Sequence, residues 1–140
     1  MEARGRLQYI DGCSDTLLIS PVLRGEACLN LLYLPPDTRQ TAHTHPSFRA
    51  GIVVAGSGVC RTENARVELR RGDIFAIEPD GLHGFHTAGE SLTVIAFHPD
   101  SDFGPWHDDH PMVNRTIVDG RSAARLSPEE RRVAPLEEQS

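Results

Sequence analysis

Gly72-Asp73-Ile74-Phe75-Ala76-Ile77-Glu78-Pro79-Asp80-Gly81-Leu82-His83 is a short apolar run that lies between two turns and leads to a histidine. Gly72-Asp73 and Pro79-Asp80-Gly81 are typical of turns, because glycine accepts positive φ and proline restricts φ. The β-branched and aromatic residues between them favour an extended conformation. This stretch therefore predicts a strand, a turn and a second strand that begins at His83.

The same alternation of short strands and turns runs through most of the chain. Gly, Pro and Asp divide the β-type runs, which occupy residues 16–20, 27–34, 51–55, 59–63, 66–69, 74–78, 83–87 and 92–98. Gly56-Ser57-Gly58 predicts a turn between two of these strands. Short strands at even spacing, with almost no helical period, indicate an all-β antiparallel sandwich or barrel.

One clear helix signal comes late in the chain. Ser127 is a favourable N-cap residue, Pro128 suits the first helical position, and Glu130 can complete a capping box. Because Pro135 interrupts the helix, residues 127–140 are expected to form a short helix and a flexible tail. Residues 1–126 are then expected to be a single β-barrel domain, since no internal repeat or interdomain linker is visible.

Two histidines separated by one residue precede the strands described first. His43 and His45 flank Thr44, and alternate residues of a strand point to the same face. Both imidazoles can therefore aim into one cavity, where His83 from a different strand would complete a triangle. Three neutral nitrogen ligands with open remaining positions are typical of a catalytic divalent metal site. Ligand type does not select the metal: Zn or Fe is expected first, with Ni, Cu or Mn as alternatives.

Together these segments resemble the cupin superfamily over residues 17–99. His43 and His45 match the histidine pair of its first motif, and Gly56 matches the closing glycine of that motif. The stretch 72–83 resembles the second motif. This resemblance implies a cupin-type double-stranded β-helix, or jelly-roll barrel, with a metal ion in its mouth.

The sequence departs from the family pattern at two positions that concern the site. Arg49 stands where the resemblance places a glutamate ligand, and no acidic residue lies between His45 and Glu63. The second motif is one residue shorter than its usual spacing, which makes His86 a rival to His83 as the third ligand. A guanidinium cannot bind a metal, but it matches a carboxylate bidentately. Arg49 is therefore expected to orient a small carboxylate; the alternative is that it faces solvent or pairs with a nearby acid.

These residues predict a metal-dependent enzyme that acts on a small, carboxylate-bearing molecule. Arg49 would orient the substrate, and His98 or His86 would move protons. Iron would permit dioxygenase chemistry, whereas zinc would restrict the protein to isomerisation, rearrangement or bond formation. The alternatives are a non-catalytic cupin that binds or senses a ligand, and an accessory protein that acts beside a larger biosynthetic enzyme.

Composition sets the remaining expectations. The 140 residues carry a formal net charge of −6, and an acidic chain without a basic stripe is a poor candidate for nucleic-acid binding. No apolar run approaches the roughly 20 residues needed to cross a membrane, and no signal peptide is visible, so a cytoplasmic protein is expected. Cys13, Cys28 and Cys60 have irregular spacing and are expected to be reduced thiols. Open sheet edges in the N-terminal strands predict a homodimer.

Overall fold

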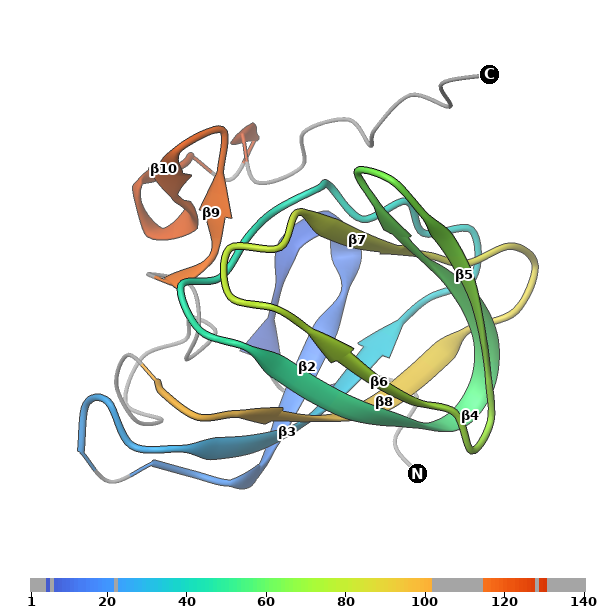
Figure 1. The fold of residues 1–140 in the computed structure, drawn as a ribbon, viewed down its shortest axis with the longest axis horizontal. Coiled ribbons are helices and arrows are strands. Elements are labelled where there is room, and N and C mark those ends of the chain that lie inside the picture. The colour runs from blue at the N-terminus through green and yellow to red at the C-terminus, as the bar shows by residue number, and fades with distance from the viewer. Residues whose placement is uncertain (1–4, 6, 22, 102–114, 128, 131–140) are drawn as a thin grey trace.

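Strands make up most of the computed structural model, which describes residues 5, 7–21, 23–101, 115–127 and 129–130 (Figure 1). The strands are β1 (Leu7–Gln8), β2 (Ser14–Ile19), β3 (Cys28–Leu34), β4 (Arg49–Thr62), β5 (Arg66–Arg70), β6 (Ile74–Ile77), β7 (His83–His86), β8 (Leu92–His98), β9 (Ile117–Val118) and β10 (Arg121–Ser122). Two short 3₁₀ turns, η1 (Ile10–Gly12) and η3 (Ala123–Arg125), accompany them. The prediction of an all-β chain is confirmed.

All strand pairs are antiparallel, and β4 organises them. Eight strands share one sheet in the order β1-β2-β3-β8-β4-β5, and β6 and β7 also pair with β4. The first part of β4 lies between β8 and β6, whereas its second part lies between β5 and β7. Figure 1 shows the sheet curling around a central space, because β4 carries the chain from one layer into the other. β9 and β10 form a separate two-stranded hairpin.

The predicted turn at Gly56-Ser57-Gly58 is wrong, because β4 continues through it as one strand. The register of β4 against β8 shifts between Val53 and Ala55, and Gly56 has a φ of 72°. A Cβ atom at Gly56 would lie 1.7 Å from the carbonyl oxygen of Ser91. The glycine therefore serves a bend within a strand, at the point where β4 moves between layers, and not a reversal of the chain.

The core lies between the two layers and is made by alternate residues of their strands. Its buried hydrophobic members are Cys13, Leu34, Val53, Cys60, Leu69, Phe85, Leu92 and Val94. The three cysteines are free and buried, which agrees with the predicted reduced thiols. One polar pair is also buried: the Asn30 amide donates a 2.6 Å hydrogen bond to the carboxyl group of Asp15.

The C-terminal segment begins as its sequence predicts. The Ser127 hydroxyl accepts a 3.1 Å hydrogen bond from the Glu130 N–H, and the Glu130 carboxylate accepts a 2.8 Å bond from the Ser127 N–H. These reciprocal bonds are a capping box. The helix and tail expected to follow lie outside the described residues. Among the residues that are described, no helix is long and apolar enough to span a bilayer.

Candidate metal centre

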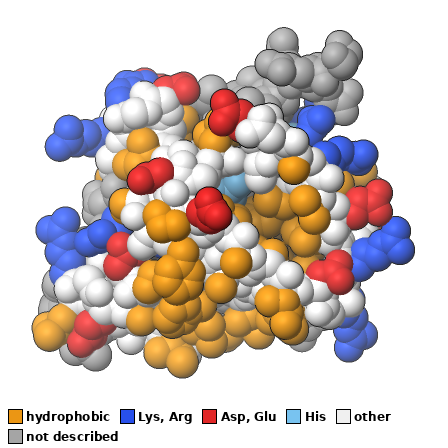
Figure 2. Space-filling view, in the orientation of Figure 1, with side chains coloured by type: hydrophobic (Ala, Val, Ile, Leu, Met, Phe, Trp, Pro, Cys, Tyr) orange, Lys and Arg blue, Asp and Glu red, His pale blue; other side chains and the backbone are white. Residues whose placement is uncertain are grey.

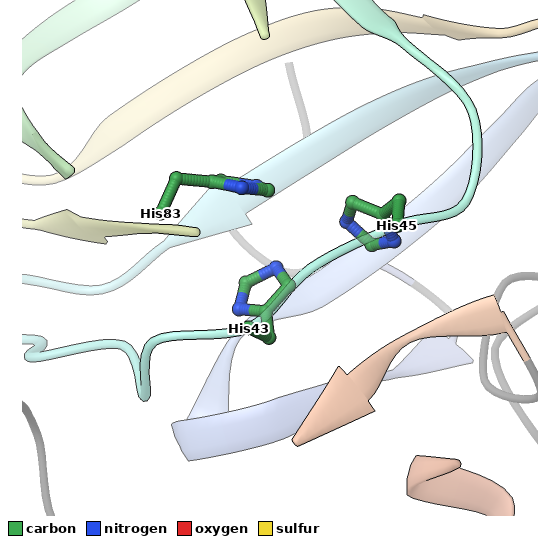
Figure 3. Close-up of side chains that lie close together, drawn as sticks. All are labelled: His43, His45 and His83. Atoms are coloured by element: carbon green, nitrogen blue, oxygen red, sulfur yellow. The ribbon is translucent and has the colours of Figure 1, made fainter. Parts of the chain in front are cut away.

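Three histidines meet inside the barrel, as Figure 3 shows. His43 and His83 form an antiparallel bridge, with N–H to O distances of 2.9 and 3.0 Å between their backbones. His45 lies two residues further on, where its carbonyl accepts a 2.7 Å hydrogen bond from the N–H of Asp80. One ring nitrogen of each histidine lies within 4.8 Å of the others, and all three side chains are buried. The triangle predicted from the sequence is therefore present.

A backbone carbonyl holds the Nδ1 atom of each ring. His43 Nδ1 lies 2.7 Å from the Thr41 oxygen, His83 Nδ1 lies 2.8 Å from the Gly81 oxygen, and His45 Nδ1 lies 3.1 Å from the Arg115 oxygen. Because a carbonyl oxygen only accepts hydrogen bonds, each Nδ1 carries the proton. Each Nε2 then has a free lone pair, which is the form of histidine that binds a metal ion. These three histidines could therefore bind a divalent metal.

Burial keeps the rings of His45 and His83 neutral. Burial and the charge of Arg49 together lower the pKa of His83 from 6.5 to about 4, against the hydrogen bond to Gly81, which raises it. Burial also lowers the pKa of His45 well below its usual range, with contributions from His43, Arg49 and His83. Neutral imidazoles are competent metal ligands at neutral pH without losing a proton first.

Arg49 is buried beside this cluster, so the alternative that it faces solvent is wrong. Its side chain is 4% exposed, and its charge acts on the pKa of both His45 and His83. Nη1 donates to Ser47 Oγ at 2.6 Å and to the carbonyl oxygens of Ser47 and Phe48 at 3.1 and 3.0 Å. Nε and Nη2 are buried with no hydrogen-bond partner among the residues that the structure describes. These two atoms form one edge of the guanidinium, the fork that accepts both oxygens of a carboxylate.

A carboxylate that the sequence did not reveal links Arg49 to the histidines. Asp100 Oδ1 lies 3.5 Å from Arg49 Nη1 and accepts a 2.5 Å bond from Ser47, and its Oδ2 accepts a 2.8 Å bond from Arg115. The backbone of Arg115 in turn holds the ring of His45. Arg49 thus does pair with an acid, but it does so through Nη1, and the edge formed by Nε and Nη2 stays unpaired among the described residues. No spacing within the sequence indicates this network, because its members come from distant segments.

The two histidines predicted to move protons lie in different places. Ala50 of β4 lies opposite Phe97 of β8. Because the strands are antiparallel, Arg49 and His98 are the next two residues to face each other, and both are buried. His98 is therefore on the inner face. The structure does not bring His86 to the cluster: His83 and Phe85 share the inner face of β7, with ring centroids 5.8 Å apart, so His86 faces the other way. The rivalry between His83 and His86 is resolved in favour of His83 as the member of the triangle.

Tyr9 also contacts the cluster, although the sequence analysis did not single it out. Its ring meets the edge of His43 at a centroid distance of 6.2 Å, and its hydroxyl lies 3.0 Å from Thr116 Oγ1. Burial raises the pKa of this hydroxyl far above its usual range. Tyr9 thus presents a neutral phenol beside His43.

A cleft of about 940 Å³ lies between β5 and β6, and its wall includes residues that contact the cluster. Gly81, whose carbonyl holds the ring of His83, is part of its wall, and so is Thr62, which faces His83 in the pairing of β4 with β7. Val67, Phe75 and Ile77 make much of the remaining wall apolar. In Figure 2 part of a histidine side chain is visible from this side, next to hydrophobic side chains. The cleft is large enough for a small molecule.

Comparison with known proteins agrees with this architecture. No curated protein matches the sequence. A cupin-like protein from Thermotoga maritima is similar in structure, with a TM-score of 0.60 and 20% identity over 76% of this chain and 90% of that one. The polyketide cyclase RemF from Streptomyces resistomycificus gives a TM-score of 0.60 and 19% identity, over 70% and 72% of the two chains. The DMSP lyase DddQ from Ruegeria pomeroyi gives 0.56 and 17% over 61% of this chain, which spans only 45% of the lyase chain.

At such identities these likenesses establish the fold, which is the expected cupin-type double-stranded β-helix. The family, in contrast, is shown by a comparison of the amino-acid sequence with models of protein families. Residues 33–133, more than half of the chain, match the family described as the AraC-like ligand binding domain. The chain therefore has a cupin-type fold and belongs to the AraC-like ligand-binding domain family.

Proposed function

We propose that this protein is a metal-dependent enzyme that acts on a small molecule bearing a carboxylate. One observation carries the proposal: three histidines with their Nδ1 atoms bonded to carbonyls converge beside a buried arginine whose Nε and Nη2 have no partner among the described residues. A purely structural histidine cluster does not need three fixed tautomers, and a structural arginine does not leave one edge of its fork buried and unpaired.

His43, His45 and His83 would hold the metal through Nε2. The set contains three nitrogen donors and no carboxylate, so it suits zinc or iron first. When bound, zinc supplies Lewis-acid chemistry, whereas iron supplies redox chemistry with dioxygen. The carbonyls of Thr41, Gly81 and Arg115 keep the ligand rings in orientation, a role that usually strengthens metal binding.

Arg49 would bind the substrate carboxylate through its Nε and Nη2 edge. Asp100 and Ser47 occupy the Nη1 side and fix the orientation of the guanidinium. Burial lowers the pKa of Arg49, because it disfavours the charged form of the guanidinium. Water also screens a buried charge weakly, so the attraction between Arg49 and a bound anion would be strong. A carboxylate held in this way would lie next to the histidine cluster, with its reactive carbon oriented by two parallel hydrogen bonds.

His98 is the candidate to move a proton during the reaction. It is buried on the inner face, at the position next to Arg49 in the β4–β8 register. Tyr9, which stays protonated, would donate a hydrogen bond and would not act as a base. The structural neighbours that are a DMSP lyase and a polyketide cyclase support small-molecule chemistry in a cupin barrel.

Elemental analysis tests the metal site first. We expect close to one zinc or iron per chain in untagged protein, and loss of this metal in the His43→Ala/His45→Ala double variant. His86→Ala is the matched control, because it removes a histidine from the opposite face of β7. A protein that holds no metal even after reconstitution would contradict the proposal and favour a ligand pocket lined by histidines.

Arg49→Gln tests the carboxylate site. By calorimetry with a panel of small amino acids and keto acids, we expect at least about a tenfold loss of affinity, since a charge-assisted bidentate contact is removed. Arg125→Gln, which alters an exposed arginine on η3, is the control. Equal affinity for carboxylates in both variants would remove Arg49 from the site.

A second function, binding or sensing a ligand without catalysis, is favoured by the family described as ligand-binding domains. The accessory role beside a larger enzyme is a third. Turnover separates them: metal-loaded protein that binds a carboxylate but neither consumes oxygen nor transforms the ligand would be a sensor. Capture of a biosynthetic enzyme from native extract would instead support the accessory role.

We also propose a homodimer. The outward face of the sheet formed by β2, β3, β8 and β4 carries exposed apolar side chains, among them Ile19, Ile52 and Phe97. Figure 2 shows hydrophobic side chains gathered where these strands run in Figure 1. Sedimentation of the wild type against Phe97→Ser tests this: a dimer that dissociates in the variant supports the face, and a monomeric wild type contradicts it.

A further inference from the structure

A second cavity, of about 350 Å³, lies on the outer face of the sheet that β5, β4 and β7 form. Val59, Arg61 and His86 of its lining alternate along the strands with Cys60 and Phe85, which point into the core. It is therefore separated from the three-histidine centre by the thickness of the sheet. The proposed function does not use this cavity.

Positive charge dominates its lining. Four arginines and one histidine line it, together with a single acid, Glu68; the basic residues are Arg39, Arg61, Arg66, Arg70 and His86. Figure 2 shows arginine side chains along the side of the molecule where β5 runs in Figure 1. This concentration is unexpected in a chain whose net charge is −6.

The strand register opposes two of these charges directly. Arg61 of β4 pairs with Arg66 of β5, and like charges at facing positions of a sheet destabilise it. The one acid is already engaged, because Glu68 lies 3.1 Å from Arg70. Neither Arg61 nor Arg66 has an ion pair within the described part of the chain. Their guanidinium donors are thus available to a ligand.

We propose that this cavity binds a small oxyanion with at least two negative charges, such as a phosphate ester or a di- or tricarboxylate. A multiply charged oxyanion between Arg61 and Arg66 would turn a repulsive pair into two charge-assisted contacts. Arg39 reaches the same cavity from the other side, since it forms a β-bridge with His86 of β7. The volume suits a small molecule, and the acidic chain as a whole disfavours a long nucleic-acid partner.

Calorimetric titration with pyrophosphate and with citrate, at matched ionic strength, tests the proposal. The test variant is Arg61→Gln/Arg66→Gln, and the control Arg24→Gln/Arg125→Gln removes the same charge from exposed positions outside the cavity. We expect binding to the wild type and to the control, and a loss of roughly a hundredfold in the test variant, about tenfold for each arginine. Binding of pyrophosphate alone would identify phosphate groups as the ligand chemistry, and binding of citrate alone would identify carboxylates.

Thermal denaturation gives an independent measurement. In chloride buffer, Arg61→Gln should raise the melting temperature by about 1–3 °C, because it relieves the repulsion with Arg66. Pyrophosphate or citrate should raise it in the wild type and not in the double variant. If the double variant does not fold, the single variant Arg66→Gln, at an exposed position, replaces it in the same two measurements, with about a tenfold loss of affinity expected. Equal responses of test and control variants, or tighter binding of a short oligonucleotide than of either small anion, would overturn the proposal.

Discussion

Acidification should destabilise the metal-free protein through His83. The pKa of His83 is about 4 in the folded protein, whereas a solvent-exposed histidine of the unfolded chain has a pKa of 6.5. The ring therefore remains neutral in the folded protein at pH values between these two. Above pH 6.5 both states are neutral and His83 adds no pH dependence. As pH falls from 6.5 to about 4, the unfolded chain takes up a proton that the folded chain refuses, and stability is lost. The gap between the two values corresponds to roughly 3 kcal/mol of unfolding free energy.

Urea unfolding of chelator-treated protein at pH 7 and pH 4, followed by circular dichroism, measures this quantity. Carboxyl groups also titrate in this range, so the decisive number is the difference between wild type and His83→Gln. We expect the wild type to lose about 3 kcal/mol more than the variant between the two pH values. An identical pH dependence in both proteins would show that His83 is not held neutral by the fold. Added zinc should stabilise the wild type at pH 7 and lose this effect at pH 4, because its ligands must be unprotonated.

Three further outcomes follow from the fold. Gly56→Ala should cost more than about 3 kcal/mol or prevent folding, because its Cβ would meet a backbone carbonyl, whereas Gly89→Ala, also at positive φ but in open space, should cost about 1 kcal/mol; urea unfolding compares them. Asn30→Ala should cost about 2–3 kcal/mol, since the buried carboxyl group of Asp15 loses a donor; an unchanged unfolding midpoint would refute this. Burial raises the pKa of the Cys60 thiol from 9.0 to about 11, so a thiol reagent should label it about a hundredfold more slowly in native than in unfolded protein, and rapid native labelling would contradict its burial.

Local chemistry explains what could be predicted from the sequence. Turn residues divide the chain at points where strands do end, so the runs 27–34 and 92–98 match β3 and β8 closely. The triangle of histidines was also predictable, since the spacing of His43 and His45 is a local pattern. The choice of His83 over His86 had a usable signal as well: Phe85, an aromatic residue two positions after His83, shares its inner face.

The remaining features depend on contacts between distant segments. Gly56 accommodates a turn or a strand bend equally well, and only the crowding against Ser91 decides between them. Asp100 follows β8 and meets Arg49 at the start of the neighbouring strand β4, and nothing near either residue in sequence indicates the other. The basic cavity escaped notice for the same reason, because strand pairing assembles arginines that are spread from Arg39 to Arg70.

The pairing of β4 with four other strands also sets the order in which this molecule can assemble. The β4–β5 hairpin is local and can form early, but the pairing of β3 with β8 must close a long loop, so folding in milliseconds to seconds is expected. His43 precedes β4 in the chain and His83 follows it, and they meet only when the barrel has closed. A nascent or partly folded chain would therefore lack the complete three-histidine site. A metal ion would then bind only after the barrel has closed, so it would stabilise the completed fold and not its folding intermediates.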